Sequence, residues 1–302
     1  MASVKIVKRG SRTYRYLVQS YRWEGIPRKK ELYLGAELPE DLTPSRALLE
    51  RTIWSETWFR QFDLIRAEYQ RRLRAVPRSV LEKESEDFVV EFTYDTNRIE
   101  GSTLSLEDTR LLLVKGITPS SKPVSDVEET RNHAKLIRRL AKSPEPVDLP
   151  RLLRWHRELF GGTKPDIAGR LRDFEVRIGA SRHLPPSAVE VRPMLLELLR
   201  WTGRSRAKIH PVQLAAEFHF RFENIHPFGD GNGRIGRVAM NMILARQGFP
   251  MLNIRYKGRG GYYHALEESS VRADSRPFLH WFFLRYSRAN RFFLIRRLPG
   301  RR

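Results

Sequence analysis

Residues 224–237, NIHPFGDGNGRIGR, carry the most informative pattern in this chain. Glycines at positions 229, 231 and 233 allow the backbone to turn sharply and to approach a ligand closely. The stretch leads directly into a helical pattern, and the first amides of a helix have no internal partners, so they bind phosphate. The segment therefore predicts a glycine-bent phosphate-binding loop (Gly229, Gly231 and Gly233) at the start of a helix.

The side chains of this loop add chemistry to the predicted cradle. His226 lies at the start of the loop, and an unperturbed imidazole pKa of about 6.5 suits proton abstraction at neutral pH. Asp230 supplies a hard oxygen ligand suited to Mg²⁺ that bridges phosphates. Arg234 and Arg237 are three residues apart and share one helix face. A base, a metal ligand and two cations beside a phosphate cradle indicate nucleotide transfer.

Two simpler interpretations compete for the same residues. An EF-hand loop also contains Asp-x-Asn-Gly, but with Gly233 as its required glycine, Ala239 stands where a bidentate Glu is needed, so this interpretation fails. The other is a His-Pro turn followed by a glycine-rich connector, with His226 as an ordinary polar residue. The residues alone leave that alternative open, although it does not explain why the glycines, Asp230 and the two arginines occur together in one loop.

Composition narrows the classes of protein that fit. The 302 residues hold 56 Lys and Arg against 35 Asp and Glu, a net charge of +21, which favours anionic partners. The absence of Cys excludes disulfide scaffolds, thiolate metal sites and a Cys nucleophile. No uncharged apolar run reaches the roughly 18 residues of a membrane span, and the first residues show no apolar signal core. We expect a cytoplasmic protein with no membrane partner.

The pattern along the chain predicts a mainly α fold. Residues 12–35 favour a basic β-hairpin, and residues 168–186 favour a short β-hairpin or flap. An apolar stripe predicts a long helix that ends at Pro77, and most of the later segments have helical periodicity. The predicted parts are an N-terminal basic β-hairpin module (1–42), a linking helix (43–78), a helical domain (79–290) and a basic tail (291–302).

The loop resembles the active-site motif of the Fic family, His-x-Phe-x-(Asp/Glu)-Gly-Asn-Gly-Arg-x-x-Arg, at every specified position. The resemblance implies a Fic-type helical bundle over 79–290 and transfer of AMP from ATP to a Ser, Thr or Tyr hydroxyl of a protein, with release of pyrophosphate. The resemblance implies that His226 is the base, that Phe228 anchors the loop and that Asp230 binds Mg²⁺ (or Mn²⁺). It also implies that the backbone around Gly231, Asn232 and Gly233 forms an anion site. Arg234 and Arg237 would then bind the outer phosphates. The intact Gly-Asn-Gly favours adenylylation over the kinase activity of Doc-like relatives.

The resemblance extends to other segments of the chain. Residues 96–101, TNRIEG, are similar to the family's inhibitory motif, (Ser/Thr)-x-x-x-Glu-(Gly/Asn), which implies that Glu100 pairs with Arg237 and inhibits the enzyme. Residues 169–186 are similar to the flap that pairs with an extended target segment. Residues 261–267 match the stretch that covers adenine, so Tyr262 and Tyr263 are candidates to stack on the base, although adjacent helical residues point about 100° apart and only one should do so.

A second class of function uses the charge instead of the loop. The net charge of +21 and the basic hairpin also fit a nucleic-acid-binding protein built on a Fic-like scaffold, although the sequence shows no helix-turn-helix, RNP or zinc signature. Nucleic-acid binding can also accompany the enzyme activity as an accessory property. The resemblance leaves open a homodimer and removal of AMP from a modified target at the same site.

Overall fold

The computed structural model describes residues 2–179 and 181–295. It divides the chain into two compact units, Met1–Leu64 and Ile65–Arg302, and each is described here by itself. The predicted basic tail (291–302) falls largely outside the described residues, apart from a short helix α12 (Arg291–Ile295). The other domain boundaries predicted from the sequence stay predictions, because the change of unit at Leu64 falls within the predicted linking helix.

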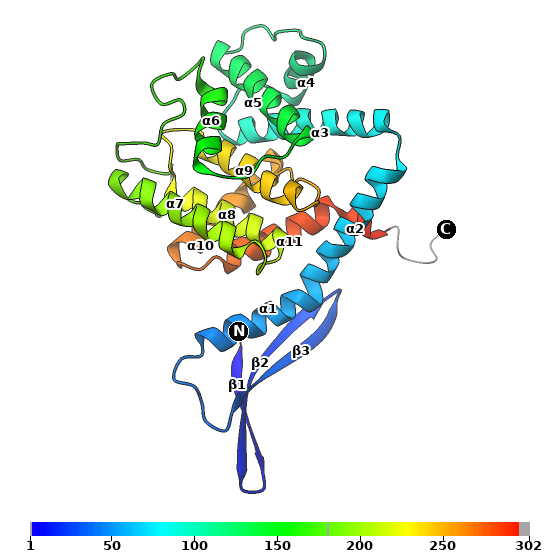
Figure 1. Cartoon of the computed structure of the whole chain (residues 1–302), viewed down its shortest axis with the longest axis vertical. Helices are drawn as coiled ribbons and strands as arrows, with labels where there is room; N and C mark the ends of the chain where they lie inside the picture. The colour runs from blue at the N-terminus through cyan, green and yellow to red at the C-terminus, as the bar shows by residue number, and fades with distance from the viewer. Residues whose placement is uncertain (1, 180, 296–302) are drawn as a thin grey trace. The chain divides into compact units, whose positions relative to one another are not determined.

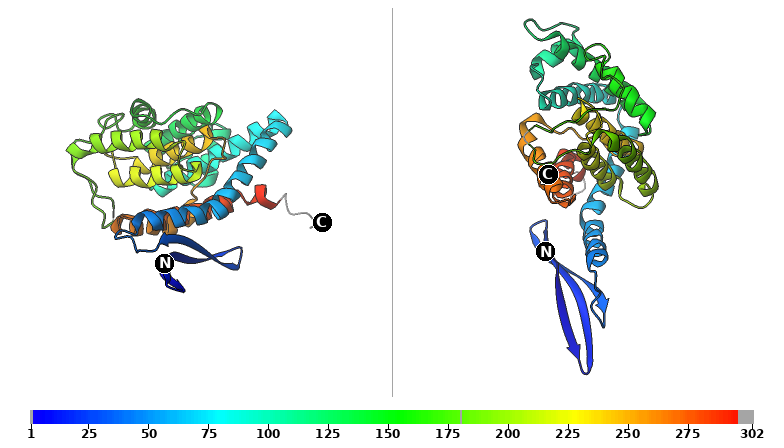
Figure 2. Two further views of the ribbon diagram at one scale, coloured as in Figure 1. Left: turned by 60° about the horizontal axis from the view of Figure 1, so that its bottom comes forward. Right: turned by 90° about the vertical axis from the view of Figure 1, so that its left-hand side faces the viewer.

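The N-terminal unit is a small antiparallel sheet with a helix on one face (Figure 2). Its strands are β1 (Ser3–Arg9), β2 (Arg12–Trp23) and β3 (Ile26–Gly35), in the order β1-β2-β3. The predicted hairpin corresponds to β2 and β3. Strand β1 was missed because it is an edge strand with mostly exposed side chains, so its sequence lacks a buried apolar alternation.

A small apolar cluster joins the sheet to helix α1 (Thr43–Trp54). Leu17 of β2 is buried against Leu49 and Ile53 of α1. Helix α1 continues through one π-helical turn, η1 (Ser55–Phe59), into α2 (Arg60–Ala75), so the chain is helical over most of the predicted segment 43–78. An isolated hairpin is marginal in water, and packing against α1 stabilises this one.

The second unit is a bundle of helices, which confirms the mainly α prediction. After α2 come α3 (Arg78–Ile99), α4 (Leu106–Val114), α5 (Val124–Lys142), α6 (Leu149–Phe160), α7 (Ala188–Ser205), α8 (Pro211–Ile225), α9 (Asn232–Arg246), the 3₁₀ turn η2 (Tyr256–Gly258), α10 (Arg259–Val271) and α11 (Arg276–Ala289).

Helices α8 and α9 lie at the centre of this bundle (Figure 1). Every residue of α9 from Asn232 to Leu244 is buried, so this helix has no solvent face. The two helices approach closely at Gly236, where an added Cβ would lie 2.4 Å from Oε1 of Glu223. The loop 226–231 that joins them is therefore fixed at both ends by the core.

The predicted flap hairpin is wrong in its secondary structure: the described part of residues 168–186 contains no strand. Arg172 organises the segment instead, because its guanidinium donates to the carbonyl oxygens of His226 (2.8 Å), Phe174 (3.0 Å) and Pro186 (2.5 Å). The last two carbonyls belong to the two arms that a hairpin would pair, and Pro186 has no N–H to donate. One nearly buried arginine thus replaces a strand ladder.

Candidate active site

Two residues in the left-handed conformation shape the loop between α8 and α9. His226 follows α8 with φ of 51°, and Gly231 precedes α9 with φ of 77°. A Cβ at Gly231 would lie 2.3 Å from the ring of Phe160, so space as well as φ requires glycine there. A non-glycine residue in this conformation costs about 1–2 kcal/mol, and such strain concentrates at functional sites. His226 is thus held in a costly geometry by its surroundings.

Buried contacts fix the middle of the loop. The Phe228 ring is fully buried and stacks on His156, with the ring centroids 4.0 Å apart. His156 Nδ1 accepts the Gly169 N–H at 2.9 Å, so Nε2 carries the proton and donates to the carbonyl oxygen of Asp230 at 3.0 Å. Burial lowers the pKa of His156 to about 4, which keeps the ring neutral. His156 therefore supports the loop through both of its ring nitrogens, and the predicted anchor role of Phe228 agrees with the burial of its ring.

Asn232 shapes the loop with its side chain. Its Oδ1 accepts the Phe228 N–H at 2.8 Å, and its amide group donates to the Phe228 carbonyl at 2.9 Å. Both polar atoms of the side chain are therefore occupied. Any contact between Asn232 and an anion has to come from its backbone amide in the first turn of α9, where amides lack helical partners.

His226 has the protonation state that a general base needs. Its Nδ1 lies 3.3 Å from the carbonyl oxygen of Glu223, and since a carbonyl only accepts, Nδ1 carries the proton and Nε2 keeps a lone pair. Burial lowers the pKa of His226 below its usual value, and the Glu223 carbonyl opposes that shift. The ring is therefore neutral at pH 7 with Nε2 available as an acceptor.

Asp230 is ionised within a cluster of charges at the loop. Burial opposes its ionisation, but Lys164 at 2.5 Å and Arg234 at 3.4 Å outweigh burial and lower the pKa of the carboxyl. Arg234 is also in an ion pair with Glu129 and lies over the Phe160 ring, 4.5 Å from its centroid. Lys164 also pairs with Glu129, at 3.2 Å. The first predicted phosphate cation is therefore held by two carboxylates.

The second predicted cation, Arg237, is held by the inhibitory motif. Its guanidinium is 1% exposed and donates to Oγ1 of Thr96 at 2.6 Å, to the carbonyl oxygen of Thr96 at 3.1 Å and to Oε1 of Glu100 at 2.7 Å. The Glu100 carboxylate also lies against the first turn of α9, because a Cβ at Gly233 would be 2.2 Å from Oε1. Glu100 thus occupies the two features, a guanidinium and a helix N-terminus, that attract a phosphate.

A buried polar pair lies behind Arg237. Burial raises the pKa of Glu223 to about 8, and the charge of Glu100 adds to this while Arg237 opposes it. Oε1 of Glu223 lies 3.7 Å from Nδ1 of His219, which is beyond hydrogen-bond distance. Burial keeps His219 neutral by lowering its pKa to about 3. A neutral Glu223 next to the Glu100–Arg237 pair is a feature that the sequence did not predict.

The two adjacent tyrosines of α10 have different surroundings. Tyr262 is 1% exposed, and its hydroxyl lies 2.8 Å from Nε2 of His219, so it belongs to the core. Tyr263 is 46% exposed, and its hydroxyl donates to the carbonyl oxygen of Ile99 at 3.0 Å. As expected for neighbours on a helix, only one ring is accessible to a base, and it is Tyr263. The prediction that Tyr262 stacks on the nucleotide does not fit its burial.

The residues present fit Mg²⁺ only as an ion carried with phosphates. The described residues include no cluster of three or more His, Asp or Glu with metal-binding geometry. Asp230 is one carboxylate, 39% exposed, at the mouth of the loop. Mg²⁺ is commonly bound by one or two carboxylates together with substrate phosphates and waters, so this donor set is sufficient when the nucleotide supplies the rest.

The structure brings the predicted loop residues together with Glu100, which directly follows α3, and it adds Thr96, Glu129 and Lys164. Thr96 was visible as the first residue of the inhibitory motif. Lys164 follows α6 in a polar loop without periodicity, and its local sequence contains no signal of a functional role. Arg172 was not predicted either, because its partners are backbone carbonyl groups, which every residue carries.

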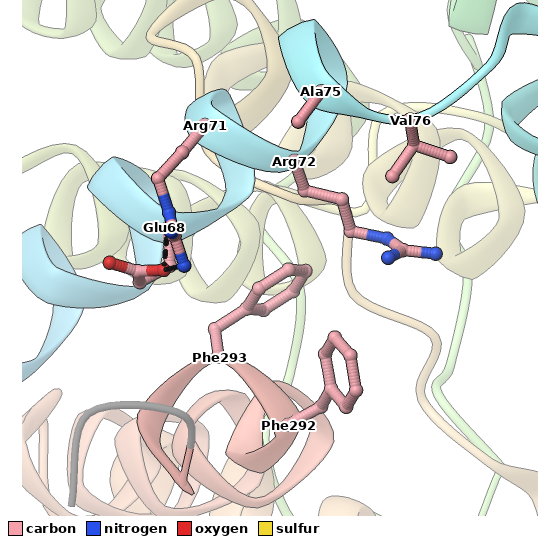
Figure 3. A pocket seen from close by; sticks show the side chains of 7 residues that line it. All are labelled: Glu68, Arg71, Arg72, Ala75, Val76, Phe292 and Phe293. Carbon is pink, nitrogen blue, oxygen red and sulfur yellow. Dashed lines mark hydrogen bonds and ion pairs between the residues drawn. The ribbon is translucent and has the colours of Figure 1, made fainter. Parts of the chain in front are cut away.

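A separate hollow lies away from this site, between α2 and α12 (Figure 3). Phe292 and Phe293 face Arg72 there, and the guanidinium of Arg72 lies 5.6 Å from the centroid of the Phe292 ring. It contains none of the predicted site residues, so we assign it no part in the chemistry.

Comparison with known proteins supports the class that the fold and loop define. Residues 146–244 match the Fic/DOC family. Two curated relatives are a protein adenylyltransferase fic-1 of Caenorhabditis elegans, 33% identical over 196 residues, and a protein adenylyltransferase Fic of Nematostella vectensis, 31% identical over 193 residues. These matches cover 63% and 62% of this chain but only 38% and 44% of the relatives.

Solved structures agree over a longer stretch. A Fic domain-containing signaling protein from Bacteroides thetaiotaomicron has a TM-score of 0.69 at 25% identity and covers 78% of this chain and 95% of its own. A segment of Fic-1 from C. elegans has a TM-score of 0.68 at 26% identity and covers 83% of this chain and 73% of its own. Residues 146–244 thus match the Fic/DOC family, and the helical unit is similar in fold to these solved Fic proteins.

Proposed function

We propose that the chain is a protein adenylyltransferase, which transfers AMP from ATP to a Ser, Thr or Tyr hydroxyl of a target protein. The observation that carries the proposal is the intact loop from His226 to Arg237, with Nε2 of His226 unprotonated and Arg234 and Arg237 behind it. The names of the curated relatives support the same reaction. They give no support to nucleic-acid binding as the main activity.

In the proposed reaction, Nε2 of His226 takes the proton from the target hydroxyl. The oxygen then attacks the α-phosphorus of ATP, and the bond to the bridging oxygen breaks, so that pyrophosphate leaves. The rigid loop contributes by keeping His226 in place, since a positioned general base accelerates such a step by about 10²–10⁴-fold. The amides around Gly231–Gly233 and the guanidinium of Arg234 offset the phosphate charge.

Magnesium is part of this proposal. Asp230 would hold the ion against the phosphates, and the ion would supply neutralisation of the phosphate charge and orientation of the leaving group. Because Asp230 is already ionised beside Lys164, no proton has to leave it when a cation arrives. Removal of divalent ions with EDTA should abolish transfer, and added Mg²⁺ or Mn²⁺ should restore it.

We further propose that the described conformation is inhibited. Glu100 engages Arg237 and lies against the first turn of α9, where the outer phosphates of ATP would bind. An ordinary surface ion pair contributes only about 0–1 kcal/mol to stability. This pair is different, because the guanidinium of Arg237 is only 1% exposed and its partner is the carboxylate of the inhibitory motif, Glu100. Activation then requires displacement of Glu100, and the same carboxylate can align a water for AMP removal.

The Tyr263 ring is the proposed contact for adenine, and the segment organised by Arg172 is the proposed contact for the target chain. Ser270 Oγ lies 2.6 Å from Oδ1 of Asn224 and 2.8 Å from the carbonyl oxygen of Leu266, so its one hydroxyl hydrogen is engaged within the domain. The homodimer and the cytoplasmic location stay predictions. No helix within residues 2–179 and 181–295 has both the length and the apolar character to cross a bilayer.

The deciding experiment follows label from ATP into protein. The Glu100→Gly variant is incubated with ATP labelled at the α-phosphate or at the γ-phosphate, with His226→Ala added as the inactive control. Label from the α position alone supports adenylylation, label from the γ position identifies a kinase, and no label from either overturns the proposal.

A further inference from the structure

The sheet of the N-terminal unit has one face that its own helix leaves uncovered. Leu17 and Leu32 are paired across β2 and β3 on the covered face, where they pack toward α1. Because side chains alternate along a strand, their neighbours Tyr16 and Tyr33, also paired, project from the opposite face. Figure 2 shows α1 along only one side of the sheet.

Three tyrosines cluster on this open face. The Tyr33 ring lies 5.3 Å from Tyr16 and 6.2 Å from Tyr14, measured between centroids. Tyr33 is 52% exposed, an uncommon state for so large a side chain within a cluster of rings. Tyr14 and Tyr16 are half-buried and Val18 on the same face is buried, so Tyr33 is the most accessible ring of the cluster.

Basic side chains lie along the same face of the sheet as the tyrosines. The register places five exposed basic residues on this face, against the single acidic residue Glu31: Lys5, Arg9, Arg12, Arg22 and Lys29. Residues 1–35 hold nine Lys and Arg against two Glu, a net charge of +7, whereas residues 36–64 hold three Arg against six Asp and Glu. The positive charge of this unit is therefore concentrated on the sheet.

Glu31 partly offsets the charge on this face. Its carboxylate pairs with Lys29 at 3.0 Å and with Lys5 at 3.1 Å, and hydrogen bonds from these two lysines lower its pKa. All three groups are solvent-exposed enough that a phosphate can compete for the ammonium groups. We name the surface made by Tyr14, Tyr16, Tyr33 and the five basic residues the tyrosine face.

We propose that the tyrosine face binds single-stranded nucleic acid, with bases stacked on the tyrosines and phosphates on the basic side chains. Stacking on an aromatic side chain is tolerant of sequence, since every base has a π-face, and a positive groove follows the backbone. A duplex hides its base faces within the helix, so a surface of exposed rings favours single strands. This inference is independent of the adenylyltransferase proposal.

A membrane surface fits the tyrosine face less well. Interfacial binding buries Trp, Phe or Leu side chains at the boundary of headgroups and acyl chains. By the strand register, the aliphatic residues of this face within residues 3–9, 12–23 and 26–35 are Val7, which is half-buried, and Val18, which is buried, and no Leu, Ile, Phe or Trp lies on it. The chemistry is that of rings beside cations, which matches bases beside phosphates.

The test is fluorescence anisotropy with the full chain and labelled oligonucleotides of about a dozen nucleotides, as single-stranded DNA, single-stranded RNA and duplex. We expect tighter binding of single strands than of the duplex, with a steep loss of affinity as salt rises. Single-stranded DNA and RNA share the proposed chemistry, and the two probes show which is preferred. Equal or tighter binding of the duplex, or no binding at low salt, would overturn the proposal.

Variants separate stacking from general electrostatic attraction. Tyr33→Leu keeps an apolar side chain but removes the ring and should weaken binding at least about fivefold, while Tyr33→Phe should retain it. Lys29→Gln should weaken binding and flatten the salt dependence, and Glu31→Gln should strengthen binding. The matched control is Lys83→Gln at an exposed position of α3.

Each comparison has a contrary outcome. If Tyr33→Leu binds like the wild type, or if Lys83→Gln loses as much affinity as Lys29→Gln, the tyrosine face is not the binding surface. Vesicles containing phosphatidylserine form a further arm, and binding of vesicles without binding of oligonucleotides would also overturn the proposal. Circular dichroism of each variant checks that the sheet is retained.

Discussion

Cations of the loop and cations of the tyrosine face are held in opposite ways. Arg237 is 1% exposed and bound to Glu100 and Thr96, and Arg234 is 5% exposed and bound to Glu129. Lys29 is 50% exposed and shares one carboxylate, Glu31, with a second lysine. The helical unit keeps these cations buried and already paired, while the sheet presents its cations to solvent.

This difference sets what a ligand has to do at each place. A nucleotide that uses Arg237 must first displace a carboxylate from a site with little solvent, where charge interactions are strong. A polyanion at the sheet meets solvated ammonium groups, whose interactions are weakened by salt. An excess of positive charge therefore indicates where anions can bind. Whether that anion binding can be regulated depends on whether the cations are already paired with carboxylates.

The largest effect should come from the base of the loop. In the Glu100→Gly background, His226→Ala should lower AMP transfer by about 10²–10⁴-fold, because proton removal from the target hydroxyl loses its acceptor. Radiolabel incorporation measures the change. His264→Ala, at an exposed position of α10, is the matched control, and oligonucleotide binding should be unchanged in both variants. Near-normal transfer by the His226 variant would remove this residue from the role of base.

The next effect should come from the carboxylate that pairs with Arg237. Glu100→Gly, and more conservatively Glu100→Gln, should raise auto-modification by about 5–150-fold, the range typical of a coupling between two sites. Glu82→Gln removes a carboxylate from an exposed ion pair of α3 and should leave transfer unaltered. If Glu100→Gln is no more active than Glu82→Gln, the Glu100–Arg237 pair is structural only.

A smaller effect is expected where α10 contacts the end of α3. Tyr263 donates to the carbonyl of Ile99, the residue before Glu100, so its hydroxyl helps to hold Glu100 in place. Tyr263→Phe should raise transfer about 2–10-fold with an unchanged KM for ATP, since one hydrogen bond is lost and the ring is kept. Tyr263→Ala should instead raise KM. Identical kinetics of the two variants would contradict this division between hydroxyl and ring.

The smallest effect is a pH dependence of stability from Glu223. Its pKa in the folded chain is about 8, above its ordinary value of 4.5, so the folded state binds more protons than the unfolded state between these values. The contribution of Glu223 is most favourable below the unfolded pKa and is lost as pH rises through about 8. From pH 6 to pH 9, the Tm of the wild type should therefore fall more than the Tm of Glu223→Gln. Each kcal/mol of lost unfolding free energy should lower the Tm by roughly 2–4 °C. An equal fall in Tm for the two proteins would contradict the buried, neutral state of Glu223.

The sequence predicted the loop well because its residues are contiguous. His226, Asp230, Arg234 and Arg237 lie within twelve positions, and a glycine-bent entry to a helix fixes their relation locally. Glu100, distant in the sequence, was identified only through the resemblance of residues 96–101 to the family's inhibitory motif. That resemblance also implied the ion pair with Arg237, which the structure contains.

Features that depend on tertiary contacts were not predictable in the same way. Lys164 reaches Asp230 from a loop without periodicity, and Arg172 takes up backbone carbonyls, which have no sequence signature. The flap was predicted as a hairpin because its residues alternate, but the carbonyls of Phe174 and Pro186 bind Arg172. Strand β1 escaped prediction because it is an exposed edge.

The most direct test of the account is the affinity for a non-hydrolysable ATP analogue, measured by titration calorimetry in a double-mutant cycle. The wild type, Glu100→Gln, Arg237→Gln and the double variant are compared, after thermal melts confirm that each is folded. We predict that Glu100→Gln tightens binding by about 5–150-fold and that this gain disappears when Arg237 is also replaced. Equal affinity of the wild type and Glu100→Gln, or the same gain without Arg237, would contradict the claim that Glu100 holds the phosphate-binding cation.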